Sequence, residues 1–189
     1  YLSLIMILQT RFSPLPEIQT DRLLLRQIKL SDASEVFYLR SNPEVLKYIG
    51  KEPCQSIEEA AAFIGKVLTD LEAGDGVAWA ITLKDDPEIM IGHIGFWRMD
   101  KSAFRAEIGY LIHPQHWGKG LIKEAIKATL QFGFQTMNLH SVEARISPQN
   151  LASAAVLEAN GFIKEGHLKE SFCFREKFED TVIYSILNK

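Results

Sequence analysis

The chain has 189 residues, of which 47% are hydrophobic and 24% are charged, so we expect residues 1–189 to form a single domain with a substantial core. The formal net charge of -3 and the lack of long like-charge runs argue against nucleic acid and membranes as partners, and the mild acidity favours a cationic substrate. Cys54 and Cys173 lie in no CxxC pattern, so we expect reduced thiols, no metal site and a cytoplasmic protein.

The first eight residues are mostly apolar. They lack a basic flank, a small-residue cleavage site and the length of a membrane span. We therefore expect residues 1–17 to be an N-terminal extension or a lead-in to the first strand, rather than a signal or an anchor. Met6 is an alternative start of the natural chain.

The next elements are one strand and two helices. Leucines and arginines alternate in "TDRLLLRQI", which predicts a strand. The segment "DASEVFYLR" follows candidate N-cap residues, which predicts a helix. Ser56 and Glu59 form a capping box for a longer helix, which Gly74 ends.

The second half of the chain predicts a sheet with helices inserted between its strands. Three apolar runs joined by short turns, "VAWAITL", "IMIGHIGFW" and "FRAEIGYLI", predict an antiparallel meander. Apolar residues then recur at intervals of four after Gly120, which predicts a long helix. A strand "SVEARI", a helix "NLASAAVLEAN" and strands in "FIKEGHLKESF" and "DTVIYSIL" follow. We therefore expect an α+β fold with a mixed, mostly antiparallel sheet flanked by helices.

The stretch "PQHWGKGLIK" combines two glycines with the start of a helix. A strand that passes through glycines into a helix leaves N–H groups unpaired at the positive end of the helix dipole, where phosphate oxygens bind. Gly118 and Gly120 allow a ligand to approach the main chain closely. Lys119 and Lys123 are unfavourable beside that dipole unless an anion is present. The alternative is a loop hinge with solvated lysines.

Two segments, "AEIGYLIHPQHWGKGLIKEA" and "VEARISPQNLASAAVLEANGF", resemble the GNAT superfamily of acetyl-CoA-dependent N-acetyltransferases. The resemblance extends over about residues 18–187 and is closest to the branch of ribosomal-protein alanine and serine N-acetyltransferases. It implies a sheet whose fourth and fifth strands splay apart, which leaves a V-shaped opening for acetyl-CoA and an acceptor amine. It also implies acetyl transfer by direct attack through a tetrahedral intermediate.

The family's pyrophosphate loop, Q/R-x-x-G-x-G/A, matches literally from Gln115, but we prefer the register that begins at Trp117. In that register the larger side chain of Ile122 replaces a small residue near the phosphates. The resemblance then implies that one continuous run of residues holds the CoA phosphates. These residues are Trp117, Gly118, Lys119, Gly120, Leu121, Ile122 and Lys123.

The resemblance also implies contacts with the pantetheine arm and the thioester. Tyr110, Leu111 and Ile112 match the strand whose main chain binds the arm and directs an N–H at the thioester oxygen; the alternative is an ordinary buried strand. Asn150 matches an asparagine that contacts the arm, and an N-cap is the alternative. Ser153 is the candidate acid for the departing thiolate, because the position of the family's catalytic tyrosine is Leu157 here.

A base must remove a proton from the acceptor amine, because free amines are mostly protonated at neutral pH. Glu107 is the first candidate and Glu143 the second, and for each the alternative is a salt-bridged strand carboxylate. The acceptor is the N-terminal amine of a ribosomal or other protein, or a small amine such as a polyamine, an amino acid or an aminoglycoside. A non-catalytic acyl-CoA-binding module is the competing function, and the chain is a monomer or a homodimer.

Overall fold

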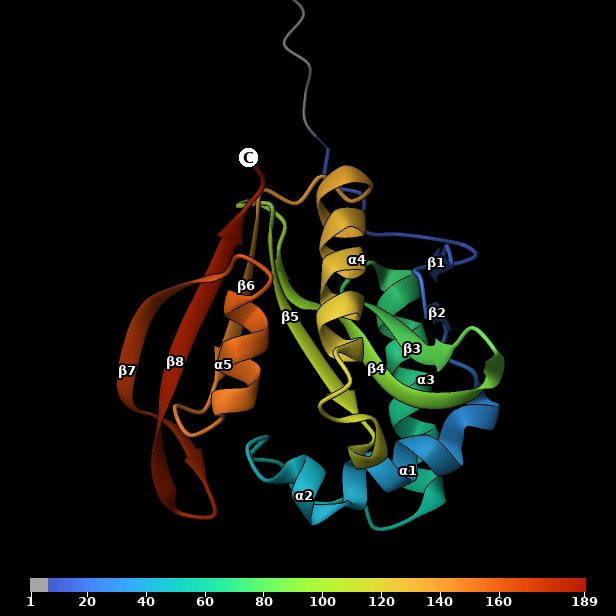
Figure 1. Cartoon of the computed structure of the whole chain (residues 1–189), viewed down its shortest axis with the longest axis horizontal. Helices are drawn as coiled ribbons and strands as arrows, with labels where there is room; N and C mark the ends of the chain where they lie inside the picture. The colour runs from blue at the N-terminus through green and yellow to red at the C-terminus, as the bar shows by residue number, and fades with distance from the viewer. Residues whose placement is uncertain (1–6) are drawn as a thin grey trace, which may run out of the picture.

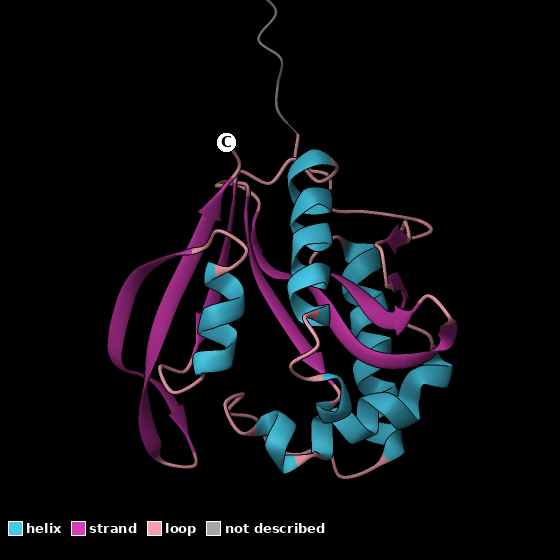
Figure 2. Cartoon of the chain, in the orientation of Figure 1, coloured by secondary structure: helices cyan, strands magenta, loops and turns pink. Residues whose placement is uncertain are grey.

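A single sheet of eight strands forms the centre of the computed structural model, which describes residues 7–189 (Figures 1 and 2). Met6 and the residues before it lie outside the described part of the chain. The sheet order is β1-β2-β3-β4-β5-β6-β8-β7. The strands are β1 (Ile18–Gln19), β2 (Leu23–Gln27), β3 (Val77–Leu83), β4 (Asp86–Asp100), β5 (Arg105–Ile112), β6 (Ser141–Ile146), β7 (Ile163–Phe174) and β8 (Lys177–Leu187). The helices are η1 (Leu30–Asp32), α1 (Ala33–Ser41), α2 (Pro43–Leu46), α3 (Ile57–Ala73), η2 (Pro114–His116), α4 (Leu121–Gln135) and α5 (Leu151–Glu158).

Helices cover both faces of the sheet. Side chains alternate between the faces along a strand, and in β3 Trp79 and Ile81 belong to one core cluster while Ala80 belongs to the other. The first cluster includes Ile126 of α4 and Leu157 of α5, and the second includes residues of α1 and α3. Figure 1 accordingly shows α4 and α5 in front of the sheet and α3 behind it. The expected mixed, mostly antiparallel α+β fold is confirmed.

The strands β5 and β6 form the one parallel pair of the described sheet, and they pair only at their first residues. Their register joins Arg105 to Ser141 and Glu107 to Glu143, and no further pairs follow. β5 continues along β4 to Ile112, while β6 continues along β8 as far as Ile146. The two strands therefore separate toward their C-terminal ends, as Figure 1 shows, and this opening lies between the segments that match the family motifs.

Three short or extended elements differ from the sequence-based expectations. Neither β1 nor α2 was expected, because two residues and one turn are too short to show periodicity. The side chain of Asn42 accepts hydrogen bonds from the N–H groups of Glu44 and Val45, and Pro43 occupies the first turn, so local capping starts α2. β4 is longer than predicted, because the turn before it is only two residues long. No helix within residues 7–189 is long and apolar enough to cross a membrane.

Candidate active site

The loop between β5 and α4 presents a row of unpaired backbone N–H groups. The N–H groups of Gln115, His116 and Trp117 donate to His113 Nδ1, the His113 carbonyl and the Pro114 carbonyl, at 3.2, 2.9 and 3.0 Å. The helical ladder starts where Glu124 N–H donates to the Gly120 carbonyl, at 3.2 Å. Between these points, the N–H groups of residues 118–123 donate to no group of residues 7–189. The free donors thus begin after Trp117, and the register that starts at Trp117 rather than at Gln115 stays a prediction.

The start of α4 differs from the starts of α3 and α5, whose N–H groups are capped by the side chains of Ser56 and Asn150. Gly120 is the N-cap of α4 and has no side chain to do this. Gly118 and Gly120 have φ angles of 71° and 75°, in the left-handed region that glycine adopts without strain. A Cβ added to Gly118 would meet nothing within 4 Å, so the loop faces open space. The geometry suits an anion that binds main-chain donors.

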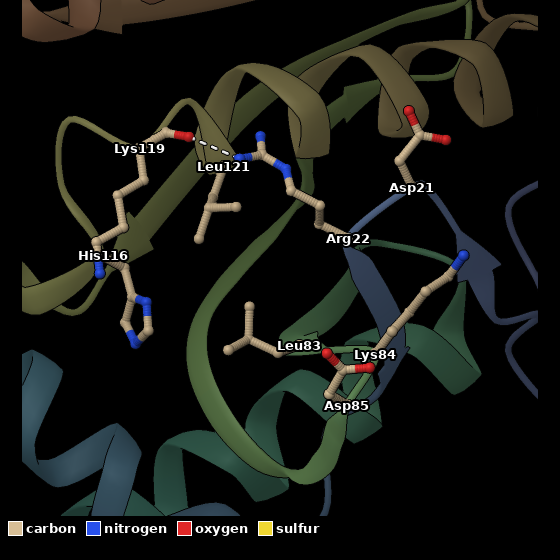
Figure 3. Close-up of a pocket in the computed structure, with 8 residues that line it drawn as sticks. All are labelled: Asp21, Arg22, Leu83, Lys84, Asp85, His116, Lys119 and Leu121. Atoms are coloured by element: carbon tan, nitrogen blue, oxygen red, sulfur yellow. Dashed lines mark hydrogen bonds between the residues drawn. The ribbon is translucent and has the colours of Figure 1, made fainter.

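The side chain of Arg22, just before β2, holds this loop to the sheet (Figure 3). Its Nη1 donates to the Lys119 carbonyl at 2.9 Å, and its guanidinium forms an ion pair with Glu124 at 2.7 Å. Thr20 Oγ1 also donates to Glu124, at 2.6 Å. Burial raises the pKa of Glu124, but the hydrogen bonds from Thr20 and Arg22 outweigh it, so the pKa lies below its ordinary value. Nothing in the sequence indicated the contact between Arg22 and Lys119, which lie 97 positions apart.

A pocket of about 370 Å³ lies on the β2 side of the loop (Figure 3). Its lining comes from the turn before β2, the end of β3 and the turn after it, and the segment from η2 to the start of α4, with no residue from β6 or α5. The residues are Asp21, Arg22, Leu83, Lys84, Asp85, His116, Lys119 and Leu121. The pocket is therefore separate from the opening between β5 and β6.

The end of β5 presents some of its backbone groups to that opening. The N–H of His113 donates to a β4 carbonyl at 2.8 Å, and the carbonyl of Leu111 lies against β4. Because the direction of the N–H and C=O groups alternates along a strand, the main-chain N–H and C=O groups of Tyr110 and Ile112 point the other way, toward β6. The indole Nε1 of Trp117 donates to the Ile112 carbonyl at 3.0 Å, which ties the loop to the strand. Of the three predicted pantetheine residues, Tyr110 and Ile112 thus have main-chain groups facing the opening.

The hydroxyl groups of Tyr110 and Ser153 meet across the opening at 2.7 Å. Burial raises the pKa of Tyr110 to about 12, against an opposing effect of the Ser153 hydrogen bond, so the phenol stays protonated at neutral pH. The Oδ1 atom of Asn150 accepts from Ser153 N–H at 3.1 Å, so Asn150 is the N-cap of α5. Leu157 lies in the core. Tyr110 therefore brings a phenol to Ser153 from β5, a contact that the sequence did not indicate.

The two candidate bases, Glu107 and Glu143, lie side by side on one face of the sheet, because they are register partners. Glu107 forms an ion pair with Arg98 at 2.9 Å, and Glu143 is paired with Arg105 and Arg145 at 2.6 and 2.9 Å. Burial raises the pKa of Glu143, but its hydrogen bonds with Arg145 and Arg105 outweigh it and lower the pKa below its ordinary value. Both side chains are thus salt-bridged strand carboxylates, and the role of either as a base stays a prediction.

The β7–β8 hairpin reaches the connection between α2 and α3. Phe172 lies against Gly50, and Nε of Arg175 donates to Glu52 at 2.9 Å. Beyond the end of β5, the rings of Tyr38 and His113 stack with centroids 4.3 Å apart. These contacts join the helical side of the protein to the strands on both sides of the opening.

Comparisons with known proteins agree on one family. The family described as "Acetyltransferase (GNAT) domain" matches residues 22–163. The chain is 38% identical to the N-acetyltransferase YoaA of Bacillus subtilis over 91% of this chain and 97% of that protein. A GNAT-family acetyltransferase of Bacillus anthracis has a structure with a TM-score of 0.80, at 30% identity, over 91% of this chain and 98% of that one.

Two further relatives have named acceptors. The chain is 27% identical to the [ribosomal protein uS5]-alanine N-acetyltransferase of Escherichia coli, over 92% of this chain and 91% of that protein. It is 26% identical to the spermidine N(1)-acetyltransferase of Vibrio cholerae, over 84% of this chain and 89% of that protein. These relatives act on chemically different amines, so the similarity does not single out one acceptor.

Proposed function

The chain belongs to the GNAT acetyltransferase family and is an acetyl-CoA-dependent N-acetyltransferase, and we propose that it acetylates the primary amine of an acceptor that enters between β5 and β6. The observation that carries this proposal is the row of unpaired N–H groups over residues 118–123, at the start of α4 and beside that opening. Main-chain donors in a helix N-terminal loop bind phosphate oxygens, and acetyl-CoA carries a pyrophosphate.

The proposed donor site has two parts. The free N–H groups of residues 118–123 bind the pyrophosphate, with Lys119 and Lys123 adding positive charge. The open-edge backbone groups of Tyr110 and Ile112 pair with the pantetheine arm. Ile122 packs against the core, so its side chain need not lie between the loop and the phosphates. Arg22 and Trp117 position the loop without touching the reacting atoms.

The proposed reaction is direct transfer. Glu107 takes a proton from the acceptor ammonium, the amine nitrogen bonds to the thioester carbon, and a β5 N–H that faces the opening stabilises the resulting oxyanion. The carbon–sulfur bond then breaks as the amide forms. As this bond breaks, the amide nitrogen releases its second proton to water, and Ser153 gives its hydroxyl proton to the CoA thiolate and regains one from the protonated phenol of Tyr110. Tyr110 then takes a proton back from water, so the net products are the acetylated amine, CoA thiol and one proton, which Glu107 releases to solvent. No cysteine is required, because no acyl-enzyme forms.

The N-terminal amine of a ribosomal or other protein is one acceptor in this proposal, and a small amine such as a polyamine, an amino acid or an aminoglycoside is the other. The similarity to the alanine N-acetyltransferase supports the first class, and the similarity to the spermidine N-acetyltransferase supports the second. The cytoplasmic location and the state of monomer or homodimer stay predictions.

The test is release of free thiol from acetyl-CoA with a panel of amines, comparing the wild-type protein with Gly120→Asp. We expect acceptor-dependent thiol release from the wild type and a large loss of acetyl-CoA affinity in the variant, because a carboxylate would stand among the phosphate donors. Tight acetyl-CoA binding without acceptor-dependent thiol release would instead favour the acyl-CoA-binding module. Unchanged affinity in a folded Gly120→Asp protein would contradict the placement of the pyrophosphate.

A further inference from the structure

The carboxylates at the junction of β5 and β6 lie beneath a layer of arginines. The side chains of Glu107 and Glu143 are only 10% and 14% exposed, whereas their partners Arg98, Arg105 and Arg145 are 69%, 37% and 44% exposed. A third carboxylate, Glu165, is bound to the Ser185 hydroxyl. An acceptor that approaches this face therefore meets guanidinium groups before it meets carboxylates, although the chain as a whole is acidic.

Arg40, at the end of α1, is a half-buried cation without a hydrogen-bond acceptor. Its guanidinium lies 4.0 Å from the centroid of the Phe63 ring in α3, and its side chain makes no hydrogen bond or ion pair with any group of residues 7–189. Burial lowers its pKa. A guanidinium has five donors, and removing them from water without acceptors is unfavourable. Such an unpaired group is typical of a site that a ligand completes.

A second unpartnered polar group lies on the same wall. The side chain of His93 in β4 is buried, and its Nε2 has no hydrogen-bond partner in the described part of the chain. Its ring lies 6.0 Å, between centroids, from the same Phe63 ring that Arg40 covers. Burial, together with the charges of Arg40 and Lys51, lowers the pKa of His93 to about 4, so the ring is neutral at pH 7.

Lys51 is affected by the charges of both Arg40 and the candidate base Glu107. Its pKa lies below the ordinary value because of burial and the charges of Arg40 and Arg98, while Glu107 raises it. Like Arg40, it has no carboxylate partner within residues 7–189. The positive charges of Arg40 and Lys51 therefore repel each other, and the negative charge of Glu107 attracts Lys51.

We propose that the acceptor carries, besides its amine, an anionic carboxylate or phosphate that binds Arg40 and Lys51 while the amine lies at Glu107. This inference rests on the proposed acetyl transfer and specifies its acceptor class. The guanidinium of Arg40 supplies two parallel N–H donors to such a group, and Lys51 supplies a point charge. The neutral ring of His93, as its Nε2–H tautomer, supplies a further donor.

The experiment compares matched acceptors that differ only in the anionic group. These are O-phosphoethanolamine against ethanolamine, β-alanine against its amide, and spermidine as a purely cationic amine. We expect kcat/KM to be at least about tenfold higher for the charged member of one or both pairs, which also identifies the anion as phosphate, carboxylate or either. Equal or better use of the member without the anionic group in both pairs, or better use of spermidine than of every anionic acceptor, would overturn the inference and leave the transferase proposal standing. Absence of thiol release with every amine would overturn both.

Variants test the residues. Arg40→Gln should remove most of the preference for the charged acceptor while the Kd for acetyl-CoA stays within about twofold of wild type. Lys51→Gln should reduce the same preference by a smaller factor, because a lysine supplies a point charge without the paired donors of a guanidinium. Lys127→Gln removes an exposed lysine of α4 and is the control that keeps the preference. An unchanged preference in folded Arg40→Gln and Lys51→Gln proteins would overturn the assignment.

Discussion

Replacement of Gly118 by alanine separates the cost of backbone strain from the loss of phosphate binding. Gly118 has a φ of 71°, so a Cβ there costs about 1–2 kcal/mol of folding free energy. No atom lies within 4 Å of the added Cβ, so no steric clash adds to this cost. The protein should therefore fold, with its free energy of unfolding reduced by only that amount.

The effect on acetyl-CoA should be larger than the effect on stability. The methyl group would stand in the open space beside the free N–H groups of residues 118–123, where the phosphate oxygens are proposed to bind. Loss of one hydrogen bond to a charged group costs about 1.5–3 kcal/mol. Because about 1.4 kcal/mol corresponds to a factor of ten, we expect the Kd for acetyl-CoA to rise by roughly 10- to 100-fold.

Calorimetric titration with acetyl-CoA and urea unfolding measure the two effects separately. Gly65→Ala is the control, because Gly65 lies in α3, also has nothing within 4 Å of an added Cβ, and has no positive φ. That variant should gain about 0.5–1 kcal/mol of stability with unchanged acetyl-CoA affinity. A folded Gly118→Ala protein with a Kd within twofold of wild type would refute the reasoning.

The other predictions concern proton transfer, pH and the acceptor side. Tyr110→Phe should lower kcat by at least about tenfold with unchanged acetyl-CoA affinity, and equal kcat values in steady-state assays would exclude the phenol as the proton source for Ser153. In the folded protein the pKa of His93 is lowered to about 4, whereas in the unfolded chain it is about 6.5. As the pH falls from 6.5 to 4, the unfolded chain therefore binds a proton at His93 that the folded protein does not bind, and the folded state loses stability. Over this range the wild-type protein should lose about 3 kcal/mol more free energy of unfolding than His93→Gln. Parallel urea-unfolding curves for the two proteins would contradict this. Gly50→Ala places a Cβ against Phe172 of the β7–β8 hairpin, and it should raise the KM for the acceptor severalfold while the Kd for acetyl-CoA stays unchanged. Equal changes in KM and Kd would show that the contact between Gly50 and Phe172 does not affect acceptor binding alone.

Local patterns in the sequence predicted most of the regular elements. The alternation in "SVEARI" corresponds to β6, at Ser141–Ile146, and the capping box at Ser56 corresponds to the start of α3. Each of these signals lies within the element itself, as periodicity or as a cap. The two-residue β1 and the one-turn α2 have too few residues to carry such a signal.

The glycine loop before α4, the proposed phosphate site, was also predictable as a structural feature, because its glycines and the following helix are contiguous in sequence. The contact that holds this loop to the sheet was not predictable, because Arg22 reaches Lys119 only after β2 has been placed in the sheet. The hydroxyl pair of Tyr110 and Ser153 likewise depends on how β5 and α5 meet, so the sequence indicated the serine without its partner. Pairwise contacts between distant segments are set by tertiary packing, which a local pattern does not encode.

The charge at the acceptor side shows the same limit. Net charge predicted a cationic substrate, but it says nothing of which charges lie outermost. The structure places Glu143 beneath Arg105 and Arg145, and among residues 7–189 it gives Arg40 no carboxylate partner. The local surface is therefore opposite in sign to the chain as a whole.

Amide resonances of residues 118–123, followed by NMR during titration of the wild-type protein with CoA, test the phosphate loop most directly. We predict that these six resonances shift and that their hydrogen exchange slows, because free N–H groups become hydrogen-bonded to the pyrophosphate. The first amides of α3, Ile57 and Glu58, start another helix and should not change. If CoA binds with unchanged resonances throughout residues 118–123, the central claim is wrong.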